Sequence, residues 1–231
     1  MSFDTEEASL SEPPRKVQIP SAILMSQKAW SLIREETLRA GKKETGGVLV
    51  GCRVTYDSKP FLVVVAASGA GSKADRQLYT YAPEVEALQQ ALDQVCQDYL
   101  QKGVRVDYIG EWHKHPKGMT YLSREDIKQG QTILTDPDYN LEYGEIILPI
   151  ATLAGKNSLS FGWLFGQSDD QPTGQPDGQE SPPNGKGKDV VELHTYYLSQ
   201  LHPEALELEL MIWEEGALDN LLAEVSLLQS S

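Results

Sequence analysis

The chain has 231 residues, 40% of them hydrophobic, and a formal net charge of −14, which is typical of one large globular domain with appendages. The negative charge disfavours nucleic-acid binding and suits either a basic partner surface or solubility alone. Cys52 and Cys96 have no paired spacing, which argues against a disulfide framework and a cysteine-based zinc site. No apolar run approaches the roughly 20 residues that span a bilayer, and residues 1–16 lack the apolar segment of a signal peptide. We therefore expect a soluble, cytoplasmic protein that binds neither nucleic acid nor membrane.

The first 40 residues are predicted to pass from disorder to a helix. Residues 1–16 are polar and have little to bury, so we expect them to be disordered. Residues 16–20 are expected to form a short edge strand. An amphipathic helix is then predicted to start at Ser21 or Ser26 and to end near Ala40. Its apolar positions are Ile23, Trp30, Ile33 and Leu38.

A hairpin and a second helix are predicted next. Apolar runs at 48–55 and 61–67 flank the turn 56–60, a pattern that predicts a β-hairpin. A loop over 69–76 leads to a short strand over 78–81. Pro83 suits the first position of a helix, which is predicted to run to about Lys102 with five apolar residues facing inward, Val85, Leu88, Leu92, Val95 and Leu100.

The rest of the chain is predicted to add strands, two helices and an insertion. Residues 167–189 contain four Gly, four Pro and no aliphatic or aromatic residue, so we expect a disordered insertion. We therefore predict one domain over residues 17–231, of the α/β class, with helices around a mixed, mainly antiparallel sheet. Its later strands are predicted over 104–113, 145–153, 159–165, 190–198 and 205–213, and its later helices from Ser123 and over 217–228.

Two histidines mark a candidate metal site. His113 and His115 stand two residues apart at the end of a predicted strand, so their side chains point to the same face with Cα atoms roughly 6.5–7 Å apart. Both imidazoles can then bind one zinc ion at about 2.0–2.1 Å. Pro116 ends the strand because it has no N–H for the ladder. Asp126, in the first turn of the next helix, is the predicted third ligand, and three protein ligands leave a fourth position for water, as in catalytic zinc sites.

Several nearby residues allow more than one interpretation. Ser123 and Asp126 also have the spacing of a helix capping box, which is compatible with metal binding. Glu125 competes with Asp126 as a ligand. Glu111 is predicted to lie on the same strand face as His113, either as a partner of a metal ligand or as a partly exposed strand residue.

The predicted site also has candidates for proton transfer and oxyanion binding. Zinc lowers the pKa of a bound water to about 7, and a general base is needed beside that water. Glu44, which precedes Gly46 and Gly47 at a strand start, is the candidate base, since the two glycines allow the backbone to pass close to the site. Ser123 is the candidate donor to the oxyanion that forms in amide hydrolysis.

These residues resemble the JAMM motif of the MPN-domain zinc metallopeptidases. In that family a Glu, an H-x-H-P and an S-x-x-D make the active site, and this chain matches each position with Glu44, His113-x-His115-Pro116 and Ser123-x-x-Asp126. The resemblance covers roughly residues 17–166. It implies a JAB-type α/β fold, Zn²⁺ on the two His and the Asp, Glu44 as the base and Ser123 as the oxyanion donor.

The sequence around the motif, Glu-Trp-His-Lys-His-Pro, is similar to that of bacterial members of the family. Those members are encoded beside ubiquitin-like proteins and homologues of activating and conjugating enzymes, often in antiphage operons. The resemblance therefore implies a deubiquitinase-like isopeptidase that acts on a ubiquitin-like protein and its conjugates, or trims its C-terminus. The resemblance to the DNA-repair-associated branch of the family is weaker.

Two other functions use the same fold. One is a catalytically idle scaffold that binds partner proteins, as in MPN domains that lack ligands, whereas all five catalytic positions are present here. The other is a protease that processes a sulfur-carrier protein by the same chemistry. Genes for activating and conjugating enzymes beside this one would favour the isopeptidase, and a cysteine-synthase gene would favour the sulfur-carrier protease.

Overall fold

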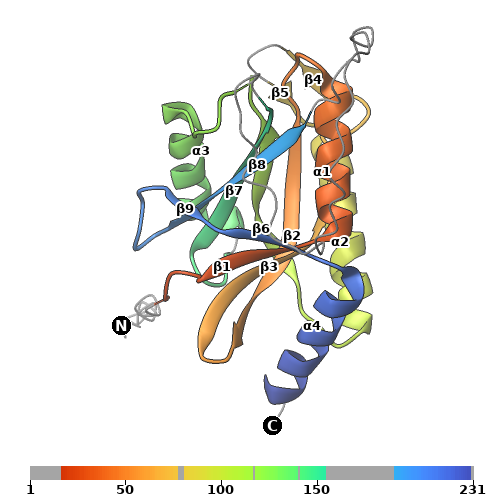
Figure 1. Cartoon of the computed structure of the whole chain (residues 1–231), viewed down its shortest axis with the longest axis vertical. Helices are drawn as coiled ribbons and strands as arrows, with labels where there is room; N and C mark the ends of the chain where they lie inside the picture. The colour runs from red at the N-terminus through yellow and green to blue at the C-terminus, as the bar shows by residue number, and fades with distance from the viewer. Residues whose placement is uncertain (1–16, 78–80, 117, 140, 155–189, 230–231) are drawn as a thin grey trace, which may run out of the picture.

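A curved eight-stranded sheet forms the centre of the molecule (Figure 1). The computed structural model describes residues 17–77, 81–116, 118–139, 141–154 and 190–229. Three pairs in this sheet, β1–β10, β1–β3 and β6–β7, are parallel and the other four are antiparallel, while β4 and β5 form a separate antiparallel pair. In spatial order the strands of the large sheet are β10 (Leu210–Trp213), β1 (Ala22–Ser26), β3 (Lys59–Ala67), β2 (Gly46–Tyr56), β6 (Asp107–Lys114), β7 (Glu145–Leu153), β8 (Val191–Ser199) and β9 (Leu206–Leu208).

Helices cover the sheet on both faces, which confirms the predicted α/β class with a mixed, mainly antiparallel sheet. Helix α1 (Gln27–Ala40) buries Ala29 and Ile33 in one core cluster with residues of β1, β2, β6 and β8. Helices α2 (Val85–Gln101) and α4 (Glu215–Gln229) share a second cluster with β2 and β3. Helix α3 (Arg124–Thr135) packs on β7 and β8, and a short 3₁₀ turn, Pro137–Tyr139, follows it.

The start of the domain differs from the prediction. Residues 17–20 form no regular element, so the predicted strand at 16–20 is wrong, and the first strand among the described residues is β1. All five residues of β1 are buried, with Ile23 and Met25 in the core cluster of α1 and Leu24 in the cluster of α4. A strand covered on both faces in this way shows no alternation of polar and apolar residues. Of the two predicted helix starts, Ser26 is confirmed, since its hydroxyl accepts a hydrogen bond from the Ala29 amide at 3.0 Å.

Helix α2 is confirmed, but two details of its prediction are wrong. Pro83 precedes the N-cap residue Glu84 and is therefore outside the helix. Val85 and Leu100 are 66% and 65% exposed. The apolar contacts with the sheet come from Leu92, Val95, Cys96 and Tyr99, which lie beyond the first two turns of the helix.

The segment 205–213 forms two strands rather than the single predicted strand. β9 pairs with β8 at one edge of the sheet, and β10 pairs with β1 at the other edge. Only Glu209 separates them, and its carbonyl accepts a hydrogen bond from the Ile23 amide at 2.9 Å. The sheet must therefore curl until one extended segment reaches both edges, as the blue segment in Figure 1 shows.

Some predictions lie outside the described residues. These are the N-terminal stretch 1–16, the strand at 159–165, the insertion at 167–189 and most of the strand at 78–81, where only β5 (Tyr81–Ala82), paired with β4 (Asp75–Arg76), is described.

The hairpin of β2 and β3 is confirmed, with Asp57 and Ser58 at positive φ in its turn. Within the described ranges, no helix combines the length and apolar character that crossing a bilayer requires.

Candidate metal centre

The two histidines lie where β6 ends in the middle of the sheet. β6 pairs with β2 on one side, opposite Gly46, and with β7 on the other, where His113 is the partner of Ile150. The His115 amide continues this pairing with a 2.9 Å hydrogen bond to the Ala151 carbonyl. Because neighbours on both sides fix the backbone, the two imidazoles are presented from a rigid element.

Three ligand atoms converge at this point. His113 Nε2 and His115 Nε2 lie 2.8 Å apart. Asp126 Oδ1 lies 3.2 Å from His113 Nε2, and Asp126 Oδ2 lies 3.2 Å from His115 Nε2. His113, His115 and Asp126 form the one group in the described part of the chain whose ligand atoms lie close enough together to hold a metal ion, all within 4.8 Å of one another.

The chemistry of this set fits a zinc ion. Two imidazoles and a carboxylate this close bring lone pairs together, which is unfavourable unless a cation or a proton lies between them. Burial opposes ionisation of Asp126, but the hydrogen bonds and charges of His113 and His115 outweigh it and hold the pKa of Asp126 well below its usual range. Two His and one Asp make three protein ligands of the types that zinc takes, the number that catalytic zinc sites use. His115 Nδ1 is buried with no hydrogen-bond partner among the described residues, so no described residue orients the ring through its second nitrogen.

The start of α3 places Asp126. The Ser123 hydroxyl accepts a hydrogen bond from the Asp126 amide at 3.1 Å, and Asp126 Oδ2 accepts one from the Ser123 amide at 2.6 Å. This is the reciprocal capping box that the spacing predicts. The same carboxylate lies beside both imidazoles, so capping and metal binding are compatible in one side chain.

Glu44 and Ser123 lie in the same cavity as the three ligand residues, a hollow of about 650 Å³. The Glu44 amide donates to the Gln77 carbonyl at 2.7 Å, which fixes the backbone just before β2. Burial raises the pKa of Glu44, while the positive charges of His113 and His115 oppose that rise. At Gly47 a side chain would collide with Ser68, since a Cβ would lie 2.1 Å from the Ser68 carbonyl oxygen. The close approach at this glycine is therefore to the end of β3 rather than to the ligands.

The other acidic candidates line this cavity without joining the ligand group. Glu111 Oε2 accepts a 3.0 Å hydrogen bond from Gln129 Nε2, and burial raises the pKa of Glu111. Glu125 lines the cavity but is not part of the cluster of converging ligand atoms. His194 instead pairs with Glu207 at 3.1 Å.

Two residues near the site were missed from the sequence. Gln129 is one helical turn beyond Glu125 and binds Glu111. Lys114 stands between the two histidines and is only 2% exposed. The sequence places the Lys114 side chain on the strand face opposite the metal ligands. It does not show that this face is buried, so it gives only a weak sign that Lys114 matters for the site.

Comparison with known proteins gives the family. Residues 26–172 match the model described as prokaryotic homologs of the JAB domain. A protein of Enterobacter hormaechei subsp. hoffmannii (strain UCI 50), named CD-NTase/cGAS isopeptidase, is 30% identical over 138 residues, which are 60% of this chain and 72% of that protein.

Among solved structures, the solution structure of protein DSY2949 from Desulfitobacterium hafniense aligns with a TM-score of 0.46 and 15% identity, over 84% of this chain and 94% of that one. A likeness of that size carries no argument. The family match covers more than half of the chain, includes every residue of the candidate metal centre, and agrees with the JAMM/MPN resemblance. The chain belongs to the prokaryotic JAB-domain family.

Proposed function

We propose that this protein is a zinc-dependent isopeptidase that releases a ubiquitin-like modifier from a lysine amine of its conjugate, or trims the modifier's C-terminus. The observation that carries the proposal is the convergence of His113, His115 and Asp126 in a cavity that Glu44 and Ser123 also line. The isopeptidase name of the Enterobacter relative supports the same reaction class.

Each residue of the site has a role in this proposal. His113, His115 and Asp126 would hold the ion, which would supply an electrophilic centre and make a water molecule more acidic. Glu44 accepts a proton from that water as the water oxygen attacks the isopeptide carbonyl carbon. The Ser123 hydroxyl donates a hydrogen bond to the carbonyl oxygen as negative charge develops on it. The C–N bond then breaks, and Glu44 delivers the proton to the departing lysine amine, leaving a free amine and a carboxylic acid, which releases its remaining proton to solvent.

The substrate and partners follow from the relative rather than from the cavity. The relative is named for CD-NTase/cGAS, so we propose an enzyme of that class as the conjugated target. Homologues of activating and conjugating enzymes, which would make the conjugate, are the further proposed partners, with antiviral defence in the cytoplasm as the setting. A complete ligand set with a base beside it favours this function over a catalytically idle scaffold.

The test is the replacement Glu44→Gln, which keeps the shape and a hydrogen bond but cannot accept the proton. Because a positioned acid–base group contributes typically 10²–10⁴-fold, we expect kcat to fall at least about a hundredfold. Zinc content and affinity for the modifier should stay unchanged, since Glu44 is outside the ligand group. The measurement is cleavage of a modifier–lysine conjugate, with metal content and binding determined on the same preparations.

Glu125→Gln is the matched control. Glu125 lines the same cavity but is outside the ligand group, so its replacement should leave kcat within a few-fold of the wild type. Near-normal cleavage by Glu44→Gln would remove Glu44 from the mechanism and make Glu111 the next candidate. Loss of zinc from Glu44→Gln would make Glu44 a ligand and overturn the assignment of the other three.

A further inference from the structure

Lys114 is a buried cation that has no part in the mechanism above. It lies on β6 between the two histidines, and its side chain points to the opposite face of the strand, the face that buries Trp112. Only 2% of Lys114 is exposed. Burying an ammonium group is costly unless hydrogen bonds and opposite charge compensate, so the surroundings of this side chain need an explanation.

Lys114 donates hydrogen bonds to the chain on both sides of Glu44, one from its side chain and one from its backbone. Its ammonium donates to the Lys43 carbonyl at 3.0 Å. Its backbone amide donates to the Thr45 carbonyl at 2.7 Å. One residue of β6 therefore holds the two carbonyls that flank Glu44, while the Glu44 amide is held by Gln77.

We propose that Lys114 is a positioning residue for Glu44, fixing the backbone on both sides of it by hydrogen bonds. This inference rests on the proposed function, in which Glu44 is the base. It gives a role to the residue between the two histidines of the H-x-H motif, which lies on the face of the strand opposite the metal ligands. Cleavage then depends on a residue that touches neither the ion nor the substrate.

The experiment compares Lys114→Met with Lys43→Met. Methionine at 114 keeps the length and the backbone amide but removes the charge and the side-chain donor. Lys43 is exposed and contributes its carbonyl to the contact, so Lys43→Met removes a neighbouring charge and keeps that hydrogen bond. We expect Lys114→Met to lower kcat by about 10- to 100-fold, the range of one hydrogen bond to a charged group, with KM and zinc content unchanged. Lys43→Met should remain close to the wild type.

Two further measurements separate positioning from general support of the fold. In the Glu44→Gln background, Lys114→Met should cause little additional loss of kcat, because the two residues act through one group. Independently of activity, NMR hydrogen exchange of the Glu44 amide should be about tenfold faster or more in Lys114→Met, with the core of β7 unchanged. If the methionine variant is insoluble, Lys114→Leu provides the same comparison, because it also removes the charge and the side-chain donor.

The outcomes are distinct. Losses that multiply in the double variant, unchanged exchange at Glu44, or loss of zinc from Lys114→Met would each overturn the positioning role. Normal cleavage by Lys114→Met, together with inactive Glu44→Gln, would remove this inference and leave the proposed function intact. Normal cleavage by Glu44→Gln would instead remove the proposed base itself.

Discussion

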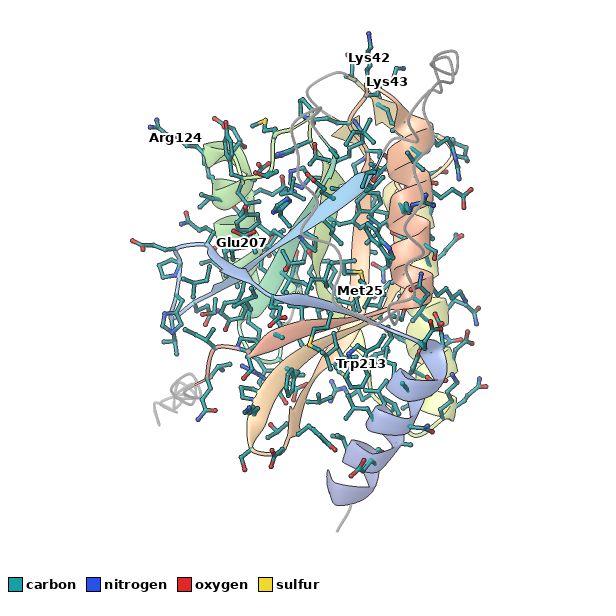
Figure 2. All side chains as sticks on the ribbon, in the orientation of Figure 1. Met25, Lys42, Lys43, Arg124, Glu207 and Trp213 are labelled. Atoms are coloured by element: carbon teal, nitrogen blue, oxygen red, sulfur yellow. The ribbon has the colours of Figure 1, made fainter. Side chains whose placement is uncertain are left out.

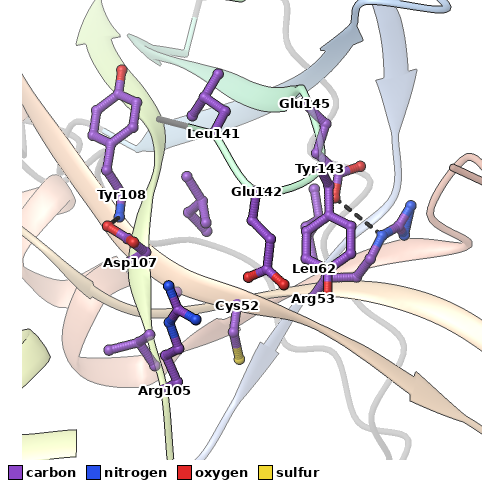
Figure 3. Close-up of a pocket in the computed structure, with 13 residues that line it drawn as sticks. Cys52, Arg53, Leu62, Arg105, Asp107, Tyr108, Leu141, Glu142, Tyr143 and Glu145 are labelled. Atoms are coloured by element: carbon purple, nitrogen blue, oxygen red, sulfur yellow. Dashed lines mark hydrogen bonds and ion pairs between the residues drawn. The ribbon is translucent and has the colours of Figure 1, made fainter. Parts of the chain in front are cut away.

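Arg53 Nε lies 3.1 Å from Glu145 Oε1, and the two side chains are only 9% and 5% exposed (Figure 3). Arg53 comes from β2 and Glu145 from β7, so the pair reaches across β6, which lies between them in the sheet. The ring of Tyr143 lies below the guanidinium carbon, 5.7 Å from it at the centroid. Burial raises the pKa of Glu145, and the charge of Arg53 opposes that rise. This buried pair is at the end of the sheet away from the metal ligands.

Replacing Arg53 by Met should strongly destabilise the fold. The change leaves Glu145 buried without its cation, and removing one partner of a buried pair typically costs about 3–5 kcal/mol in free energy of unfolding. Urea unfolding at pH 8 measures it. Arg39→Met is the control, since Arg39 is 64% exposed in its own ion pairs and its loss should cost no more than about 1 kcal/mol.

The effect of Arg53→Met should also depend on pH. Without Arg53, the folded-state pKa of Glu145 rises further above its ordinary value of 4.5. The folded state then keeps a proton that the unfolded state releases, so stability is retained below pH 4.5 and lost as pH rises through the raised pKa. Arg53→Met should therefore lose more stability at pH 8 than at pH 5, and an equal loss at both would contradict this account.

Ser123 has two separable tasks, helix capping and the proposed oxyanion contact. Glycine is nearly as good an N-cap as serine, whereas alanine costs about 1 kcal/mol. Ser123→Gly should therefore keep the stability within a few tenths of a kcal/mol and still lose about 10²-fold or more in kcat. Ser123→Ala should lose both. Thermal unfolding and cleavage assays on the two variants measure this, and an active Ser123→Gly enzyme would restrict Ser123 to capping.

Metal binding can be tested without disturbing α3. In Asp126→Asn the amide oxygen can still accept the hydrogen bond from the Ser123 amide, but the charge that would bind zinc is gone. Losing a residue that only hydrogen-bonds to a metal ligand costs about 10–100-fold in metal affinity. Asp126 is itself a proposed ligand, so we expect at least about a 100-fold loss of zinc affinity here. The intact protein should contain about one zinc, and the double change His113→Ala with His115→Ala should remove it.

His194→Ala is the control for the metal experiment. His194 pairs with Glu207 away from the ligand group, so its replacement should leave the zinc content unchanged. Elemental analysis gives the result directly. An intact protein that carries no zinc even after supplementation would exclude the proposed centre.

Deletion of residues 167–189 should leave the fold intact, because this stretch has no aliphatic or aromatic residue to bury. β7 and β8 are antiparallel neighbours in which Leu153 is the partner of Val191. The Ala154 amide also donates to the Val190 carbonyl at 2.8 Å, so a short connection can join the two strands. We expect the Tm to change by less than about 4 °C, which corresponds to about 1 kcal/mol at this chain length.

Truncation before α4 provides the contrast. Leu218, Leu221, Leu222 and Val225 of α4 are buried in a core cluster with β2 and β3, so removing the helix should lower the Tm far more than removing 167–189. A drop of many degrees on deleting 167–189 would mean that this segment stabilises the domain.

The sequence by itself determined the helices and strands with strong local signals. Ser26 and Ser123 were predictable helix starts because an N-cap is a contact between residues close in the chain. The candidate site was predictable for a related reason. A fixed spacing on one strand and in one helical turn brings His113, His115 and Asp126 within reach of each other once α3 returns to the end of β6. Figure 2 shows Arg124 of α3 and Lys43, the neighbour of Glu44, at the same end of the molecule.

Only the tertiary structure decided the features that depend on neighbours far apart in the chain. β1 was missed because it is covered on both faces and so has no alternation. Val85 and Leu100 are exposed because α2 packs on the sheet through Leu92, Val95, Cys96 and Tyr99 instead. The segment 205–213 forms two strands because the sheet curls, and Arg53 and Lys114 are buried because Glu145 and the backbone around Glu44 lie opposite them. Burial and pairing of this kind are properties of the assembled sheet, whereas local patterns record only what one element prefers.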